Sequence, residues 1–140
     1  MTQKEFPIKV GEVINGTYTL VRKLSQGKRC TIFCATDQQL RQVVIKLEKD
    51  TEGQISVCIE GAIIKIIGDT NRFPKIFQYG SYKNYKFLAM ELMGPNLIDL
   101  VNYNKHGKFS LHSVLKFGIQ AIKSIQIVHN KGFIHRDIKP

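Results

Sequence analysis

The spacing of apolar residues changes along the chain between the period of a β-strand and the period of an α-helix. The order in which these two patterns occur restricts the folds that the chain can adopt. Residues 18–48 alternate between apolar and polar as strands do, whereas apolar residues in 55–67 recur every three to four positions, as in a helix. Strand character returns between 75 and 92, and a long helical pattern covers 110–131. The sequence therefore predicts an α+β fold in which one helix interrupts a set of short strands and further helices follow.

Turn signals divide the first strand region into three antiparallel strands. The stretches "SQGKR" and "DQQLRQ" separate the alternating runs and are rich in turn-forming residues. Asn15-Gly16 is a further turn signal and suggests a short additional strand before Tyr18.

The first helical segment, 55–67, is expected to be amphipathic and to end at Gly68, which can adopt a left-handed cap. Its predicted apolar stripe is Ile55, Cys58, Ile59, Ala62, Ile63, Ile66 and Ile67. Pro95 and Asn96 are placed to begin a second, short helix.

The segment 110–131 has the strongest helical pattern in the sequence. Ser110 can cap its N-terminus and Gly132 can end it. Its predicted apolar stripe is Leu111, Val114, Leu115, Ile122, Ile125 and Val128. A stripe of this size needs a surface to pack against, since each large apolar side chain contributes about 1.5–3 kcal/mol when it is buried.

Size and charge limit the class of protein. A chain of 140 residues with 43% apolar content suffices for one compact domain, and a net charge of +10 favours an anionic partner. The basic residues are scattered, however, so a dedicated nucleic-acid surface is not indicated. Three cysteines without a C-x-x-C pair, and the lack of any apolar stretch of membrane length, predict a soluble cytoplasmic or nuclear protein without a membrane partner.

Three segments carry residues suited to phosphate chemistry. "VVIK" ends the third strand, and its alternation puts Val44 and Lys46 on one face, while Glu60 is the one carboxylate of the following helix and a possible counter-charge. "LSQGKRCTIF" forms a turn around Gly27, where backbone N–H groups can approach phosphate closely. "HRDIKP" places Asp137 two residues before a lysine, after a helix and a glycine. Each feature alone is also compatible with an ordinary exposed turn, strand or helix residue.

Taken together and in this order, the segments resemble the N-terminal half of a protein kinase domain, and more narrowly the casein kinase I superfamily with its tau-tubulin kinase branch. "MELMGPNLIDL" at 90–100 resembles that family's hinge and following helix. "FSLHSVLKFGIQAIKSIQIVHNKGFIHRDIKP" is similar to its αE helix and catalytic loop. The resemblance runs from about Val10 to the last residue.

The resemblance implies one incomplete kinase domain over 1–140. Residues from about 10 to 92 would form an N-lobe with a five-stranded antiparallel sheet, an αC helix and the start of the hinge. Residues 93–140 would begin the helical C-lobe and reach the catalytic loop.

It also implies roles for individual residues. Asp137 would be the catalytic base, Lys139 would neutralise charge on the transferred phosphoryl group, and Glu60 would form an ion pair with Lys46. Met90 would be the gatekeeper in front of a hinge at 91–93. The residues expected to bind ATP are Leu24, Ser25, Gly27, Ile32, Val44, Lys46, Met90, Glu91 and Met93.

The implied activity is transfer of the ATP γ-phosphate to serine or threonine of proteins, including acidic or already phosphorylated ones, with Mg²⁺ as the metal. The asparagine and the D-F-G aspartate that would hold Mg²⁺ are expected beyond residue 140, so no metal ligand is assigned within 1–140. We therefore expect the chain to be a fragment that is not competent for transfer alone.

Two alternatives remain. Ser25 and Cys30 stand where the family has glycines, which is compatible with a non-catalytic, pseudokinase-like binding module. A small basic nucleic-acid binder is less favoured and would show affinity that falls steeply with salt.

Overall fold

The computed structural model describes residues 7–52, 57–68 and 71–140. The chain divides into two compact units, residues 1–92 and 93–140, and each is described by itself. In these described ranges, no helix is long and apolar enough to cross a membrane.

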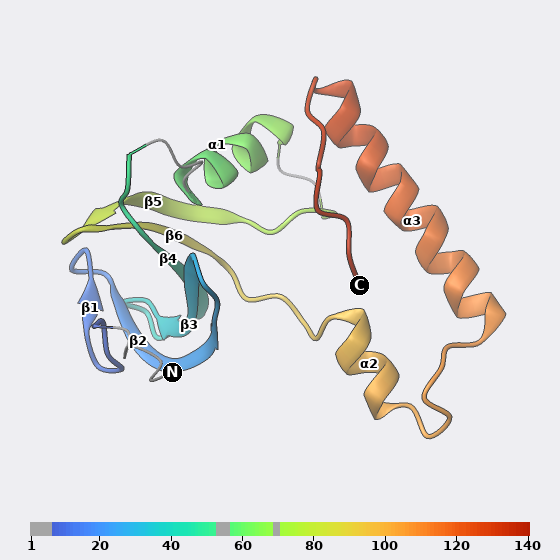
Figure 1. The fold of residues 1–140 in the computed structure, drawn as a ribbon, viewed down its shortest axis with the longest axis horizontal. Helices are drawn as coiled ribbons and strands as arrows, with labels where there is room; N and C mark the ends of the chain where they lie inside the picture. Colours follow the sequence, from blue (N-terminus) through green and yellow to red (C-terminus); the bar gives the residue numbers. More distant parts are fainter. Residues whose placement is uncertain (1–6, 53–56, 69–70) are drawn as a thin grey trace. The chain divides into compact units, whose positions relative to one another are not determined.

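The first unit is built on one sheet in which all neighbouring strands are antiparallel (Figure 1). Its strands are β1 (Val13–Ile14), β2 (Tyr18–Gln26), β3 (Cys30–Thr36), β4 (Gln42–Lys49), β5 (Ile76–Tyr82) and β6 (Tyr85–Glu91). They lie in the order β1-β2-β3-β4-β6-β5, so β4 and β6 are neighbours although a helix and β5 separate them in sequence.

Among the described residues the sheet has six strands, so the prediction of a five-stranded sheet from the family resemblance is wrong by one strand. The additional strand is β1, which the Asn15-Gly16 turn predicted. Both turn residues have positive φ, 50° and 67°, and the Thr17 N–H donates to the Ile14 carbonyl at 3.1 Å. A β-turn with positive φ at both central residues favours asparagine followed by glycine.

The two faces of the sheet have different roles. One face carries the larger core, because alternate residues of each strand point to the same side. That core consists of Ile8, Ile14, Tyr18, Leu20, Phe33, Ala35, Val43, Ile45, Leu47, Tyr85, Phe87 and Ala89. The opposite face carries a smaller buried cluster of Val44, Val57, Leu88 and Met90, with Cys30, Ile32, Ile76 and Leu92 partly buried against it.

The helix α1 (Val57–Ile67) packs against β4, β5 and β6. The predicted residue Ile55 lies outside the described residues, and the predicted stripe is partly wrong, since Ile59 and Ile66 are 47% and 57% exposed. The buried residues of α1 are Val57, Gly61 and Ile67.

Gly61 explains why the stripe was misplaced. A Cβ added at Gly61 would lie 2.6 Å from Leu88 Cδ1 and 3.0 Å from Tyr79 Cδ1, so the helix lies close against the sheet at its glycine. A count of apolar side chains ignores glycine, and an almost wholly apolar helix leaves its inward face undefined.

Gly61→Ala is therefore expected to destabilise the protein. Overpacking costs about 1–3 kcal/mol, while replacing a helical glycine by alanine returns up to about 1 kcal/mol, so we expect a net loss of about 1–2 kcal/mol in the free energy of unfolding. Urea unfolding measures it. The matched control is Gly118→Ala, where an added Cβ meets no atom within 4 Å. A Gly61→Ala protein as stable as the control variant would contradict the close approach.

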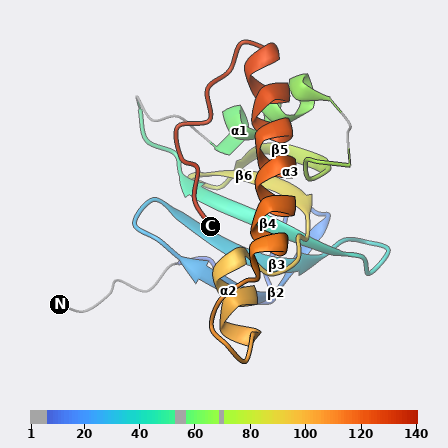
Figure 2. The same cartoon turned by 90° about the vertical axis from the view of Figure 1, so that its right-hand side faces the viewer.

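The second unit contains two helices, α2 (Leu97–Tyr103) and α3 (Leu111–Asn130), the latter drawn as one unbroken helix in Figure 2. Asn96 caps α2 by accepting the Asp99 N–H at 2.8 Å, as its position predicted. Ser110 likewise caps α3, accepting the Ser113 N–H at 3.2 Å.

The end of α3 also follows the prediction from Gly132. Its φ is +82°, its N–H donates to His129 O at 2.9 Å, and the Phe133 N–H donates to Val128 O at 3.2 Å. These two bonds form a Schellman motif, which favours glycine because the left-handed conformation strains other residues.

Most of the predicted apolar stripe of α3 is solvent-exposed. Four of its members, Leu111, Val114, Leu115 and Ile122, are 73%, 50%, 57% and 68% exposed. The expectation that this stripe packs against a further surface remains a prediction.

Candidate functional site

The pairing of β4 with its neighbours gathers several predicted site residues on one face. Lys46 lies opposite Ile32 of β3 and Leu88 of β6, and Val44 lies opposite Met90 of β6. Because paired residues point to the same side, an apolar surface surrounds the root of the Lys46 side chain. Val44 and Met90 are 9% and 7% exposed, so they line this surface without projecting far from it.

Lys46 and Glu60 are brought together across the gap between β4 and α1. Lys46 Nζ lies 2.6 Å from Glu60 Oε1, with side-chain exposures of 23% and 41%. The partial exposure matters, because a pair in contact with solvent contributes at most about 1 kcal/mol to folding. The pair therefore fixes the direction of a cation more than it stabilises the fold.

A second acid near Lys46, Glu48 of β4, holds α1, and the sequence predictions missed it. Glu48 is 7% exposed and its Oε2 accepts the Val57 N–H, the first residue of α1, at 2.9 Å. The signal was available: Glu48 follows Lys46 by two positions, so strand alternation puts both on the same buried face.

The turn between β2 and β3 carries the predicted glycine-loop residues. Leu24 lies in a β-bulge of β2 and is 38% exposed, and Ser25 pairs with Ile32. The Gly27 N–H donates to Cys30 O at 2.9 Å and closes the turn. The Cys30 thiol is partly buried, and this burial raises its pKa.

The predicted hinge residues are divided between the two units. Met90 and Glu91 end β6, and the Glu91 N–H is already bonded to Lys75 O at 2.8 Å, so it is not offered to a ligand. Met93 is 56% exposed and begins the second unit. The structure therefore brings Met90 to the Lys46 face, whereas Met93 belongs to the other unit.

The predicted catalytic residues lie together in the second unit. Lys139 Nζ is 2.9 Å from Asp137 Oδ2, and the Asp137 N–H donates to His135 Nδ1 at 3.2 Å. Arg136, between His135 and Asp137, has a φ of +64°, which is uncommon for a residue with a side chain and is shared in the described residues with Asn15, Leu40 and Lys83. Asp137 and Lys139 are 72% and 71% exposed, so both side chains are accessible.

Lys139 controls the acidity of Asp137. Its hydrogen bond and charge lower the pKa of the Asp137 carboxyl, so Asp137 remains a carboxylate to a more acidic pH than an isolated aspartate. We expect Lys139→Ala to raise this pKa towards the ordinary value of an aspartate. Titration of the Asp137 side-chain carbon by NMR measures the shift. Lys131→Ala, at the exposed end of α3, is the control, and equal midpoints for Asp137 in wild type and Lys139→Ala would contradict the ion pair.

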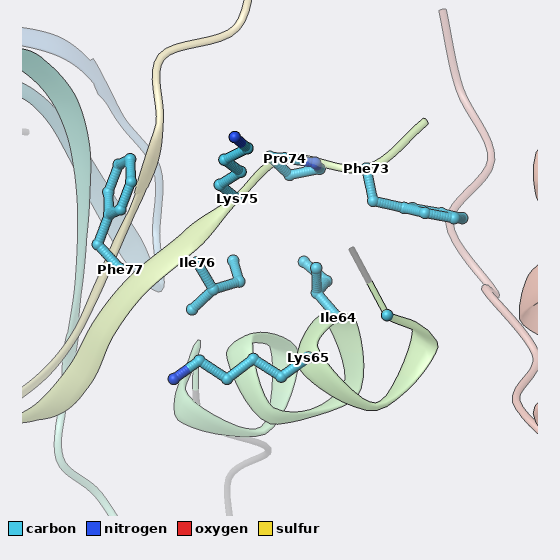
Figure 3. A pocket seen from close by; sticks show the side chains of 8 residues that line it. Ile64, Lys65, Phe73, Pro74, Lys75, Ile76 and Phe77 are labelled. Carbon is cyan, nitrogen blue, oxygen red and sulfur yellow. The ribbon is translucent and has the colours of Figure 1, made fainter. Parts of the chain in front are cut away.

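A separate cavity of about 300 Å³ lies between the end of α1 and the start of β5. Figure 3 shows Ile64 of α1 and Ile76 of β5 at this cavity, with Lys65 and Lys75 at its edge. None of its lining residues is a predicted site residue. Within the described part of the chain, no group of three or more His, Cys, Asp or Glu side chains could hold a metal ion.

The arrangement in the first unit fits a nucleotide. An apolar strip of Ile32, Val44 and Met90 suits a flat base, and an oriented ammonium group on the same face suits an anionic phosphate.

Comparison with known proteins agrees with this geometry. The chain is 39% identical over 132 residues to a probable serine/threonine-protein kinase of Dictyostelium discoideum, a match that covers 93% of this chain and 26% of the relative. The crystal structure of a kinase domain superposes with a TM-score of 0.82 and 22% identity, over 96% of this chain and 41% of that one. No protein-family model matches.

These comparisons show the fold of the N-terminal portion of a protein kinase domain. The chain spans about a quarter of the length of the curated relative it matches.

Proposed function

We propose that this chain forms the nucleotide-binding and catalytic-loop portion of an ATP-dependent serine/threonine protein kinase of casein kinase I type. The observation that carries the proposal is the Lys46–Glu60 pair, held at 2.6 Å beside the apolar residues of the same sheet face. The similarity to a probable serine/threonine-protein kinase supports the same activity. The casein kinase I assignment rests on the sequence segments at 90–100 and 109–140.

In this proposal the first unit binds ATP. Ile32, Val44 and Met90 contact the base, and Lys46 donates to the phosphates while Glu60 keeps its ammonium group in position. The turn around Gly27 covers the phosphates with Ser25 at its entrance, and Leu24 flanks the base. The roles of Glu91 and Met93 in a hinge that binds adenine come from the family resemblance.

The second unit supplies the proton acceptor. Asp137, a carboxylate at neutral pH, takes the hydroxyl proton of the substrate serine or threonine as the new oxygen–phosphorus bond forms and the bond to the ADP oxygen breaks. Lys139 offsets the charge on the transferred group. When bound, Mg²⁺ would neutralise charge on the phosphates, and we assign its ligands to no residue of 1–140.

The basic composition is consistent with acidic or already phosphorylated protein substrates. A specific observation favours a second candidate, a module that binds nucleotide without transfer. Ser25 and Cys30 flank the turn in place of glycines, and the Cys30 side chain is partly buried on the face that carries Lys46. Side chains at these positions restrict how closely the backbone can approach phosphate.

Phosphotransfer separates the two candidates. The experiment uses the full-length protein, meaning residues 1–140 together with the Mg²⁺-binding residues that the proposal expects after them. It is incubated with γ-labelled ATP, Mg²⁺ and acidic serine-containing peptides, and ATP affinity is measured in parallel. We expect label on serine or threonine. ATP binding without label would support the non-catalytic module, and the absence of both would contradict the proposed function.

A further inference from the structure

We infer that Glu48 is a positioning residue of the proposed site, which holds α1 so that Glu60 reaches Lys46. The inference rests on the proposed function and adds to it a residue that contacts no substrate. Three observations support this role: the hydrogen bond between Glu48 and the Val57 N–H, the burial of Glu48, and the positions of Lys46 and Glu48 on β4 and of Glu60 on α1.

The hydrogen bond joins the sheet directly to the start of the helix. Glu48 Oε2 accepts the Val57 N–H at 2.9 Å, and the Glu48 residue is only 7% exposed. The first N–H groups of a helix have no partner within the helix, and they favour a negative charge. A bond between a carboxylate and an amide is also stronger than one between neutral groups. A side chain from β4 therefore caps α1.

The position of this cap determines where Glu60 lies. Glu60 is in the first turn of α1, three residues after Val57, where an N-terminal cap has its largest effect. Lys46 precedes Glu48 by two residues on β4, a separation of about 7 Å along the same face of the strand. A single strand thus fixes both the lysine and the end of the helix that supplies its partner.

Two carboxylates compete near one ammonium group, and the cap separates their roles. Glu48 and Lys46 share a face of β4, and each has a different partner on α1. In the structure, Glu48 bonds to the helix amide and Glu60 bonds to Lys46. Removing the Glu48 acceptor oxygen would free the first turn of α1 and leave Glu60 less well placed.

The test compares two changes at one position in the full-length protein and keeps a third as a substitute. Glu48→Gln keeps an acceptor oxygen at the same reach, so we expect catalytic efficiency towards ATP within about threefold of wild type. Glu48→Ala removes the bond, and we expect a loss of about ten- to a hundredfold, since hydrogen bonds to charged groups contribute about 1.5–3 kcal/mol. If Glu48→Ala does not fold, Glu48→Asp, which withdraws the carboxylate by one methylene, takes its place.

A second measurement does not depend on activity. Amide hydrogen exchange in the first turn of α1 should accelerate in Glu48→Ala and stay near the wild-type rate in Glu48→Gln. The stability control is Ile67→Ala, which removes a buried side chain at the other end of the same helix. We expect it to lower the melting temperature while leaving exchange at Val57 and the KM for ATP closer to wild type.

The outcomes distinguish this inference from the proposed function. Suppose that Glu48→Ala keeps the wild-type amide exchange rate in α1 and the wild-type catalytic efficiency, while Lys46→Ala loses activity. That result would overturn the role of Glu48 and leave the proposed function standing. The role of Glu48 would also be overturned if Glu48→Ala and Ile67→Ala lost the same catalytic efficiency while losing the same stability. A wild-type protein without phosphotransfer would overturn the proposed function, and the exchange measurement would still decide whether Glu48 holds the helix.

Discussion

Asp137→Asn is expected to lower the phosphotransfer rate of the full-length protein by about 10²–10⁴-fold, the usual contribution of a general base. Asparagine has nearly the same shape but cannot accept the hydroxyl proton. An aspartate is ionised at neutral pH, and the lowered pKa of Asp137 does not change this, so its carboxylate is available as the acceptor. Because Asp137 is not expected to contact ATP, the loss should appear in kcat, with the KM for ATP changed less than about threefold.

Asp99→Asn is the matched control, since Asp99 is an exposed aspartate in the first turn of α2, in the same unit. It loses the same charge but holds no assigned role in the reaction, and its rate should equal that of wild type. A retained rate in Asp137→Asn, or the same loss in both variants, would contradict the assignment of Asp137 as the base.

Lys46→Ala is expected to reduce kcat/KM for ATP by about 10²–10³-fold, the typical cost of removing one donor to developing negative charge. Without Lys46, the phosphates lose an ammonium group that Glu60 orients at 2.6 Å. Stability should change little, because the side chains of the pair are 23% and 41% exposed and such pairs contribute at most about 1 kcal/mol. Steady-state kinetics and a thermal melt, measured on the same preparation, separate the two effects.

Lys86→Ala provides the comparison for this change. Lys86 is another strand lysine with an acidic partner, Asp50 Oδ2, at 3.0 Å, and its side chain is 31% exposed. We expect its kcat/KM to remain within about threefold of wild type. Loss of activity in both lysine variants would indicate a general effect of charge, and full activity in Lys46→Ala would remove Lys46 from the phosphate site.

Much of the sheet was predictable because alternation of side chains is a local property of a strand. The placement of Val44 and Lys46 on one face needed only a period of two, and the Asn15-Gly16 turn was enough to predict β1. The caps at Asn96 and Ser110 followed from residue type and position in the same way.

The inward face of α1 was not predictable from the spacing of apolar residues. Only Glu60 and Lys65 among its eleven residues are charged, so little in the sequence marks a solvent face, and the helix lies close against the sheet at Gly61. Packing against Leu88 and Tyr79, which are distant in sequence, decides the rotation of the helix. The bulge at Leu24 has a similar origin, because it depends on the register of β2 with β3.

The most direct test of the nucleotide site compares neighbouring residues of the same strand. In the full-length protein with labelled methyl groups, ATP should shift the NMR signals of Val44, Ile32 and Met90, which lie on the Lys46 face. It should leave Val43 and Ile45 unchanged, since they belong to the core on the opposite face of the same strand. Shifts of the Val43 and Ile45 signals as large as those of Val44, or no shifts at saturating ATP, would contradict the nucleotide site.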